Sequence, residues 1–368
     1  MVQNPPRNRE PAAQRTVILT AFGDPQATFG ETRPFLLAMT DKVERTAESA
    51  YCQGVYEGEI SGQPVVVVTT GTGGDNSGPC MQELLQMYRG EIKEVIWSGI
   101  GGATPAVGGL VDNMGYRRPA AEPVMIGDVC ISALTWNYDL HFSSVSDWVT
   151  AAIQGDWRYN PAGGWWSMQT FTGTTTVPGF ENVRQFVTTT TTLADDLLGA
   201  AQHVTWPPMP SGVQAKVARY FPADQVRPVR VFDYTQCGEV GGDNFWHGVT
   251  EDALSRQYLA GLIGASGYAS DRVGGDAVSE DTVVVFSAME AQAWMSVLAR
   301  WNEHYGEQIP MAVIRAASNY DHPPLDADGL PLPGPDGKPM TAMDDILAGF
   351  QEAGGDYAAA NAAAPVLQ

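Results

Sequence analysis

The chain of 368 residues has few basic side chains, since 21 Lys and Arg stand against 42 Asp and Glu and give a formal net charge of −21. Affinity for a nucleic acid comes mainly from Lys and Arg that displace counterions from phosphates. This balance therefore argues against DNA or RNA as a partner. Long apolar runs are also missing, because no stretch reaches the ~18 residues that a membrane-spanning helix needs.

The cysteines are few and widely spaced: Cys52, Cys80, Cys130 and Cys237 show no C-x-x-C pair. This spacing indicates neither a zinc site nor a dense disulfide framework, so we expect buried free thiols. The first residues contain no apolar segment of the kind that a secretory signal carries. We therefore expect a cytoplasmic protein, and the sequence leaves export open.

Several signature motifs are absent as well. The glycine-rich segments at 71–78 and 99–105 do not match the dinucleotide-binding pattern, because Asn76 and Thr104 stand where its third glycine belongs. No Walker A lysine, H-E-x-x-H or G-x-S-x-G motif occurs, which disfavours a P-loop enzyme, a zinc protease and an α/β-hydrolase. We expect no metal ion and no nicotinamide or flavin cofactor.

Short apolar runs alternate with helix-patterned segments between residues 16 and 325. The runs are 17–22, 65–70, 94–98, 129–134, 229–234, 282–287 and 309–317. Runs that are apolar on both faces are typical of parallel strands, so the pattern predicts an α/β fold. Residues 1–15 have the composition of a flexible leader, and 326–368 that of a turn-rich extension with a short helix and an Ala-rich tail.

A β-α-β unit is predicted at residues 282–317. Between its two apolar runs, apolar side chains recur at helix spacing, at Ala291, Trp294, Met295, Leu298 and Trp301. Parallel strands end at the same edge of a sheet, where α/β proteins bind ligands. We therefore expect Glu290 and Asn319, each of which follows one of the two runs, to face one site.

Each of these polar residues has a functional and an ordinary interpretation. The carboxylate of Glu290 can accept hydrogen bonds from a ribose diol, or it can stabilise a helix N-terminus. The amide of Asn319 can pair with the N7/O6 edge of a purine, or it can form a turn. In the segment GGDNFWHG, Phe245 and Trp246 beside Asp243 can stack on a flat ligand or belong to the core.

The order of these motifs resembles the nucleoside phosphorylase and nucleosidase superfamily. GIGGATP at 99–105, FWHG at 245–248 and SAMEAQA to VIRAASNYDHPP at 287–324 resemble the purine nucleoside permease family in particular. The resemblance covers most of residues 16–325. It implies a three-layer α/β/α domain with a central mixed, partly closed sheet, a small-molecule nucleoside as ligand, and a homo-oligomer.

The resemblance also implies roles for single residues. Met289 would lie against the sugar, Glu290 would bind the ribose hydroxyls, and Phe245 would stack on the base. The loops at Gly23, at Thr72 and Gly73, and at Gly101 and Gly102 would surround the phosphate or the attacking water.

Two departures from the family pattern affect the expected chemistry. Asn319 stands where many nucleosidases have an aspartic acid, so it cannot release a proton, and Asp321 is a candidate substitute. The arginines that hold phosphate in phosphorylases have no clear match, although Arg33 could reach the site. Water is thus preferred as nucleophile, with Asp24 or Glu31 as its base, and inorganic phosphate is a possible co-substrate.

The leading hypothesis is an enzyme that cleaves the N-glycosidic bond of purine nucleosides, as a nucleosidase or a phosphorylase. The alternative is a nucleoside-binding protein without catalysis that assists uptake, which the asparagine at position 319 favours. The segment at 18–35 also faintly resembles the start of pyroglutamyl peptidases, but no matching Cys and His segments follow it.

Overall fold

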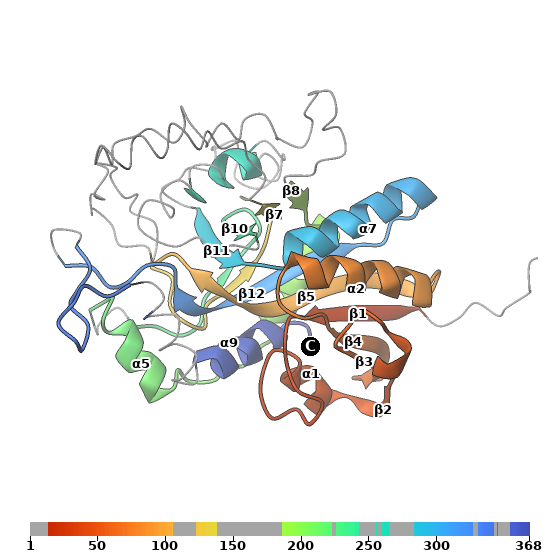
Figure 1. The fold of residues 1–368 in the computed structure, drawn as a ribbon, viewed down its shortest axis with the longest axis horizontal. Coiled ribbons are helices and arrows are strands. Elements are labelled where there is room, and N and C mark those ends of the chain that lie inside the picture. Colours follow the sequence, from red (N-terminus) through yellow and green to blue (C-terminus); the bar gives the residue numbers. More distant parts are fainter. Residues whose placement is uncertain are drawn as a thin grey trace, which may run out of the picture.

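The computed structural model describes residues 14–105, 123–137, 186–222, 226–242, 255–256, 259–264, 283–326, 330–341, 344 and 354–368. Nearly all of the expected leader and of the short helix expected near 343–350 lie outside these ranges. Within them, the chain forms a central sheet with helices on both faces, α2 and α7 on one and α1 and α9 on the other (Figure 1). The three-layer α/β/α fold expected from the sequence is confirmed.

Each apolar run predicted from the sequence contains a strand. The strands are β1 (Arg15–Thr20), β2 (Thr40–Glu44), β3 (Gly54–Ile60), β4 (Gln63–Thr69), β5 (Ile92–Ala103), β6 (Val129–Ile131), β7 (Leu134–Asn137), β8 (Phe186–Thr188), β9 (Val231–Phe232), β10 (Cys237–Gly241), β11 (Val284–Ala288) and β12 (Met311–Tyr320). No predicted run covers the strands β2, β3, β8 and β10. Strand β7 was also not predicted, since only its first residue, Leu134, belongs to a run.

The helices whose bounds the described residues give are α1 (Arg33–Ala38), α2 (Gly74–Met87), α4 (Thr191–Ala201), α5 (Ser211–Val217), α7 (Ala291–Tyr305) and α9 (Gly354–Ala363), with a short 3₁₀ helix, η1, at Thr46–Glu48. All of them lie between strands except α9, which follows β12. None of the helices in the described ranges is long and apolar enough to cross a membrane.

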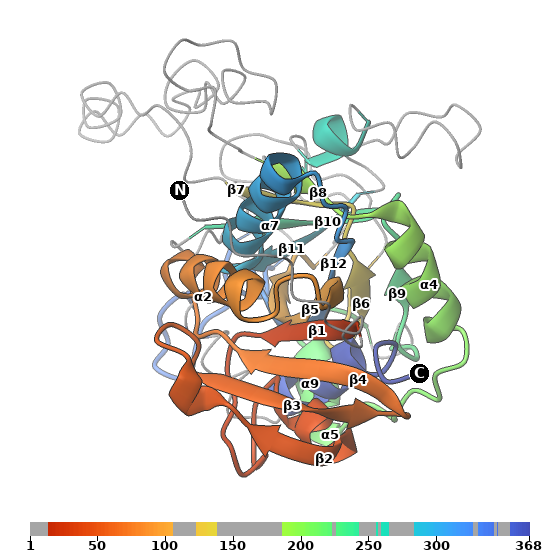
Figure 2. The same cartoon turned by 90° about the vertical axis from the view of Figure 1, so that its right-hand side faces the viewer.

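The sheet is mixed and branched. Its strands follow the order β2-β3-β4-β1-β5-β11-β10-β7-β8, while β12 pairs with β5 and leads to β6 and then β9 (Figure 2). Strand β5 is parallel to β1 and β12 but antiparallel to β11. The expected mixed sheet is confirmed. In the described residues it branches at β5 and is not closed, so the expected partial closure is absent there.

Alternate residues of the central strands enter two different cores. In β1, Val17 and Leu19 pack with α2 and α7, whereas Ile18 packs with α1 and the end of α9. Strand β4 alternates in the same way, with Val66 and Val68 on the first side. Because side chains of a strand point to opposite faces, a strand covered on both sides must be apolar throughout. This explains the near-continuous apolar runs of the sequence.

Helix α7 lies between β11 and β12, as predicted, but the expected parallel arrangement of these strands is wrong, because β11 is antiparallel to β5 whereas β12 is parallel to it. Its buried residues Trp294, Met295 and Leu298 lie on the face that packs toward the sheet and α2. The helix ends at Gly306, which adopts a left-handed conformation (φ 67°) that favours glycine. Glu290 occupies the N-cap position without a side-chain capping hydrogen bond, and β11 leads directly into the helix through Met289 and Glu290.

The Ala-rich segment near the end of the sequence forms α9, which packs on β5 and β12. Ala358 and Ala362 are fully buried, and such small side chains let a helix approach a sheet closely. The ring of Tyr357 lies against Gly127, where a Cβ atom would collide with it, and Asn361 Nδ2 donates to the carbonyl oxygen of Gly127 at 2.9 Å. The segment expected to be a tail is therefore a helix of the α1 layer.

The prediction of free thiols is wrong, because the cysteines form two disulfides. Cys52 bonds to Cys80 of α2, and Cys130 of β6 bonds to Cys237 of β10. The partners lie 28 and 107 residues apart in sequence, so no local spacing marks them. All four are buried, as expected, and only the tertiary structure brings each pair together.

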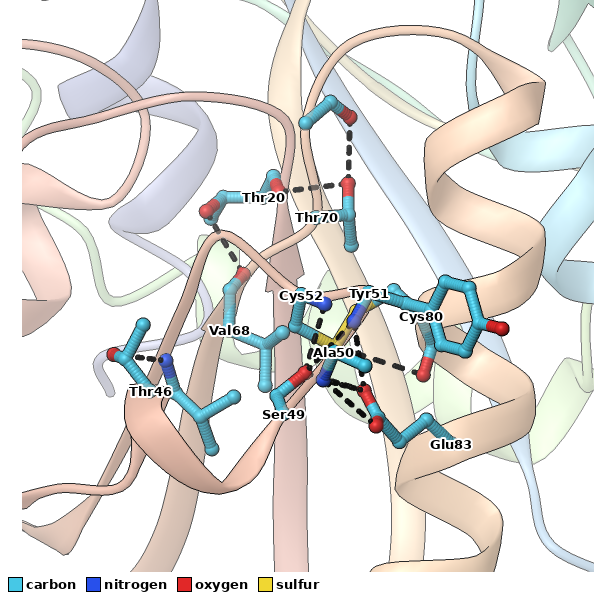
Figure 3. The surroundings of a disulfide bond; sticks show 12 residues. Thr20, Thr46, Ser49, Ala50, Tyr51, Cys52, Val68, Thr70, Cys80 and Glu83 are labelled. Atoms are coloured by element: carbon cyan, nitrogen blue, oxygen red, sulfur yellow. Dashed lines mark hydrogen bonds between the residues drawn. A yellow bond between two sulfur atoms is a disulfide. The ribbon is translucent and has the colours of Figure 1, made fainter.

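Hydrogen bonds reinforce the disulfide between Cys52 and Cys80 (Figure 3). Glu83, one turn further along α2, accepts from the backbone N–H groups of Ala50 at 2.9 Å and Tyr51 at 3.1 Å, and also from Ser49 Oγ. The segment before β3 is thus fastened to the helix whose first residues border the candidate site.

Candidate active site

The side chain of Arg315, on β12, lies at the centre of a buried group of charges. Its Nε donates to Glu239 Oε2 at 2.7 Å, and its Nη2 donates to Glu290 Oε2 at 3.0 Å. Its Nη1 donates to the carbonyl oxygen of Ile100 at 3.0 Å and lies 4.0 Å from Glu31 Oε1. We call Arg315, Glu31, Glu239 and Glu290 the Arg315 cluster. All four are buried, although they come from different elements.

The cluster is unbalanced in charge, with three carboxylates and one guanidinium among the described residues. Burial raises the pKa of Glu31 to about 7, opposed by Arg315 and assisted by Glu290. Burial also raises the pKa of Glu239, again opposed by Arg315. Arg315 remains protonated, because its three acidic neighbours outweigh the effect of burial on its pKa. No group of three His, Cys, Asp or Glu in the described ranges could hold a metal ion.

Glu31 reaches the cluster from the segment between β1 and α1. Its Oε1 accepts from the backbone N–H of Ile100 at 2.7 Å, and its Oε2 accepts from that of Ala21 at 2.5 Å. The loop before it is closed by a bridge between Gly23 and Gly30. Gly30 has φ 90°, and a Cβ atom there would lie 2.7 Å from the Cα of Gly23, so the tight return requires glycine.

The absence of a side chain at Gly99 leaves room for the side chains of the Arg315 cluster to pack against β5. A Cβ atom at this position would lie 2.6 Å from Arg315 Nη1, 2.7 Å from Glu31 Oε1 and 2.8 Å from Trp97 Nε1. The guanidinium also stacks over the ring of Trp97, with its carbon 5.0 Å from the ring centroid. The first glycine of the GIGG segment therefore makes room for the charged side chains.

Glu290 is joined to the other glycine-rich segment. Its Oε1 accepts from the backbone N–H of Gly73 at 3.2 Å, and Ser77 Oγ donates to its carbonyl oxygen at 2.8 Å. The backbone N–H of Met289 contacts its Oε2 at 3.3 Å. The structure thus brings Glu290 together with Gly73, while the neighbouring Thr72 is exposed.

Asn319 and Asp321 meet the GIGG segment at Gly102. A register shift between Ala317 and Asn319 places Asn319 opposite Gly102, and such bulges re-aim side chains. If Gly102 carried a Cβ atom, that atom would lie 3.1 Å from Asn319 Nδ2. Ser287 Oγ donates a hydrogen bond to Asp321 Oδ1 at 2.7 Å. Both side chains are buried. Gly101 also packs closely against this group, because a Cβ atom added to it would lie 2.6 Å from the carbonyl oxygen of Ser287.

A cavity of about 210 Å³ lies at the carboxyl ends of β7, β10 and β11. Its lining residues are Gly74, Asp75, Asn137, Gly242, Met289, Gln292 and Ala293. This edge of an α/β sheet is where ligands bind. Asp243, Phe245 and Trp246, which follow Gly242 in sequence, lie outside the described residues.

Asp24 and Arg33 lie near Glu31 in sequence, but their side chains support the loop. Asp24 accepts from the backbone N–H and the hydroxyl of Thr28, both at 2.6 Å, and the hydroxyl hydrogen bond is the main cause of its lowered pKa. Arg33 Nε donates to the carbonyl oxygen of Ala27 at 3.1 Å. Of the two bases considered from the sequence, Glu31 is therefore the one that joins the cluster.

Sequence reasoning missed Arg315 and Glu239. Arg315 interrupts the apolar run at 309–317, and a charge in a strand buried on both faces must have partners, so the run itself carried a signal. Glu239 lies in the short, glycine-flanked strand β10, which the apolar pattern does not reveal.

No family model and no curated protein sequence matches the chain. Among solved structures it is similar to a 5'-methylthioadenosine/S-adenosylhomocysteine nucleosidase from Neisseria meningitidis in complex with methylthio-immucillin-A. The identity is 15%, the match covers 96% of this chain and 97% of that chain, and the TM-score is 0.49.

Two further structures match over a similar length. A putative methylthioadenosine nucleosidase from Weissella paramesenteroides shares 19% identity over 97% of this chain and 96% of that chain, with a TM-score of 0.48. Futalosine hydrolase from Helicobacter pylori shares 13% identity over 96% and 97%, also with a TM-score of 0.48. Likeness at this level leaves the activity of the chain to be argued from its own residues.

Proposed function

We propose that the protein is an enzyme that hydrolyses the N-glycosidic bond of purine nucleosides. The observation that carries this proposal is the Arg315 cluster, which gathers the buried carboxylates of Glu31 and Glu290 around one guanidinium, together with the cavity lined by Met289, the residue before Glu290. The nucleoside as substrate class rests on the resemblance of the segments at 99–105 and 287–324 to the nucleoside phosphorylase and nucleosidase superfamily. Membership of the purine nucleoside permease family is part of the same proposal.

Glu31 is the proposed general base. A base is most effective when its pKa lies near the working pH, and burial raises that of Glu31 to about 7. Each of its oxygens accepts one backbone hydrogen bond and retains a second acceptor position. The carboxylate can therefore take a proton from an attacking water while the backbone of Ala21 and Ile100 holds it in place.

Glu290 is the proposed ligand of the ribose. Its Oε2 is occupied by Arg315, whereas its Oε1 accepts only a long hydrogen bond from Gly73 among the contacts described above. That oxygen can also accept from a ribose hydroxyl. The excess negative charge of the cluster favours the positive charge that develops on the sugar as the bond breaks.

The same charge favours water over phosphate as nucleophile. A phosphate ion placed beside Glu31 would be repelled by the carboxylates, and the guanidinium of Arg315 already binds two of them. Arg33 donates within its own loop.

Asn319 and Asp321 are proposed to contact the leaving base. The amide of Asn319 can donate to N7 or O6, and Asp321 is the nearby group that can supply a proton. A 6-oxopurine offers both acceptors, so we expect inosine and guanosine to be better substrates than adenosine. Stacking of the base on Phe245 or Trp246, with Asp243 nearby, remains a proposal from the sequence.

A nucleoside-binding protein without catalysis is the second candidate. The observation in its favour is that Asn319, which has no proton to release, occupies the buried position opposite Gly102. Such a protein would bind nucleosides through Glu290 and leave them intact.

The test is incubation of the purified protein with inosine, guanosine, adenosine and uridine, each with and without phosphate, followed by chromatography of the released base. We expect hypoxanthine and guanine without phosphate, and no release by Glu31→Gln or Glu290→Ala. Asp24→Asn is the matched control and should retain activity. Release only with phosphate would make the protein a phosphorylase, and binding without release would select the second candidate.

The compartment and the oligomeric state are further parts of the proposal. Buried disulfides persist in oxidising environments, so the pairs Cys52–Cys80 and Cys130–Cys237 favour such a compartment over the cytoplasm expected from the sequence. Labelling of the denatured, unreduced protein with a thiol reagent should modify no cysteine. Light scattering in solution tests the expected homo-oligomer.

A further inference from the structure

Glu239 is a buried acid for which the proposed reaction has no role. It lies in the middle of β10, opposite Phe286 of β11 and Thr135 of β7, and its exposed fraction is 0%. Ionisable side chains inside a sheet are costly unless they are paired. Its ion-pair partner is Arg315, and the backbone of Ala291 also hydrogen-bonds to it, so its effect on the charges is sought in what it does to that guanidinium.

Glu239 forms the shortest ion pair of the cluster. The Arg315 Nε to Glu239 Oε2 distance is 2.7 Å, compared with 3.0 Å from Nη2 to Glu290 and 4.0 Å from Nη1 to Glu31. A guanidinium is planar and its N–H directions are fixed relative to one another. Anchoring Nε, together with the stacking on Trp97, therefore decides where both Nη atoms point.

The resulting orientation divides the positive charge unequally among the acids. Glu239 and Glu290 form direct ion pairs, whereas Glu31 stands at the limit of ion-pair distance and relies on the backbone N–H groups of Ala21 and Ile100. The charged groups that face Glu31 are Arg315 from β12 and Glu290 from the start of α7. Glu239 is not among the main groups that shift the pKa of Glu31, and Arg315 is the charged group that both acids face.

We propose that Glu239 is a positioning residue of the active site, which orients Arg315 and takes up part of its charge so that Glu31 is left to exchange a proton. This inference rests on the proposed function of Glu31 as a base. Without the charge of Glu239, Arg315 would neutralise Glu31 more fully and hold it ionised to lower pH. The raised pKa of Glu31 agrees with this arrangement.

The first test is the pH dependence of kcat/KM in Glu239→Gln. The glutamine oxygen can still accept from Nε, so the variant removes charge and keeps the hydrogen bond. We expect the acidic limb of the profile, which reports the base, to move toward lower pH by on the order of one unit. Glu59→Gln, an exposed position on β3, is the control and should leave the profile unchanged. An unshifted profile in Glu239→Gln would overturn the proposal.

The second test does not depend on turnover. The protein is labelled with glutamate carrying ¹³C in the side-chain carboxyl group, and the Glu31 signal is assigned by its loss in Glu31→Gln. We expect its titration midpoint to fall in Glu239→Gln by the same amount as the profile. A midpoint that moves in a protein that cleaves no nucleoside would support the inference while the proposed function fails. An unchanged midpoint would contradict the inference alone.

Glu239→Asp separates charge from orientation. This variant keeps the negative charge but has a shorter reach, so the guanidinium should turn. We expect a Glu31 midpoint close to that of the wild type and a kcat lowered at least tenfold, with a smaller change in KM. A midpoint shifted as far as in Glu239→Gln, or an unaltered kcat, would contradict a positioning role.

Discussion

Two sites in the described residues pair buried carboxylates with an arginine, but they differ in the balance of charge. Asp128, before β6, binds both Nη atoms of Arg227, at 2.8 and 2.7 Å, and accepts from the backbone N–H groups of Met125 and Arg230, both at 2.8 Å. Here one acid meets one base, and four hydrogen bonds surround the carboxylate. In the Arg315 cluster, as far as the described residues show, three acids share one base.

The difference separates a structural pair from a candidate active site. A balanced, fully hydrogen-bonded pair ties two segments together, and Asp128 joins the turn at residues 125–128 to the segment that precedes β9. An unbalanced cluster opposes folding, because at least one of its acids must either lose its charge or remain incompletely neutralised. Such arrangements are found where a group must exchange a proton near neutral pH.

The two sites are physically linked. Cys130 lies two residues after Asp128, Cys237 lies two residues before Glu239, and the two cysteines are bonded to each other. The disulfide therefore holds the strand next to the balanced pair against the strand that enters the cluster.

The largest expected effect comes from removing the central arginine. Arg315→Met leaves three carboxylates buried without their cation and should lower the free energy of unfolding by up to about 5 kcal/mol at pH 7. Arg227→Met should cost less, because the side chain of Arg227 is 28% exposed and water can reach Asp128. Urea denaturation of both variants measures the difference. Equal losses would show that charge balance does not distinguish the two sites.

Removal of the linking disulfide should have the next largest effect. Cys130→Ala combined with Cys237→Ala opens a loop of 107 residues and should cost about 4 kcal/mol, since a disulfide mainly restricts the unfolded chain. The pair Cys52→Ala and Cys80→Ala opens a loop of 28 residues and is expected to cost slightly less. Thermal unfolding of both double variants checks the order, and a much smaller loss for the first would remove the argument that this disulfide holds the two sites together.

The pH dependence of stability tests Glu31. A carboxyl group whose pKa rises from 4.5 to about 7 on folding contributes stability below pH 4.5, and this contribution is lost as the pH rises to about 7. The total is about 3 kcal/mol. Relative to Glu31→Gln, which does not titrate, the wild type should therefore lose stability between pH 4.5 and 7.5.

Glu83 supplies a control of opposite sign. Hydrogen bonds from Ser49, Ala50 and Tyr51 outweigh burial and lower its pKa, so its contribution is lost as the pH falls. Urea titrations at several pH values measure both variants. If Glu31→Gln and Glu83→Gln changed stability with the same sign, the assignment of Glu31 as a neutral-range acid would be wrong.

The smallest expected effect comes from a single methyl group. Gly99→Ala places a Cβ atom within 2.8 Å of Arg315, Glu31 and Trp97 and should cost about 2 kcal/mol and most of the turnover. Gly199→Ala, in α4, meets no atom within 4 Å and should stabilise the helix by about 0.5–1 kcal/mol. Denaturation and base release measure the pair. Full activity in Gly99→Ala would show that the cluster tolerates displacement.

Much of the sheet could be predicted because its central strands are buried on both faces. Val17, Val66 and Val313 belong to such strands, and their apolar runs stand out from the sequence. Strand β2 escaped prediction because all of its residues are exposed, and β10 because two of its five residues are glycines. The expectation that Glu290 and Asn319 share one edge assumed parallel strands before them, whereas β11 is antiparallel to β5 and β12 is parallel to it.

The layered fold, the helix between β11 and β12 and the glycine-rich segments after the strands could be predicted from the sequence, because each depends on a short-range pattern, whereas the relative direction of β11 and β12 could not. The tertiary structure alone decided the cysteine pairs, the burial of α9, and the choice of Glu31 over Asp24 as the acid beside Arg315. These contacts join residues far apart in the chain. A local pattern shows that a buried charge needs a partner, but not which distant residue will reach it.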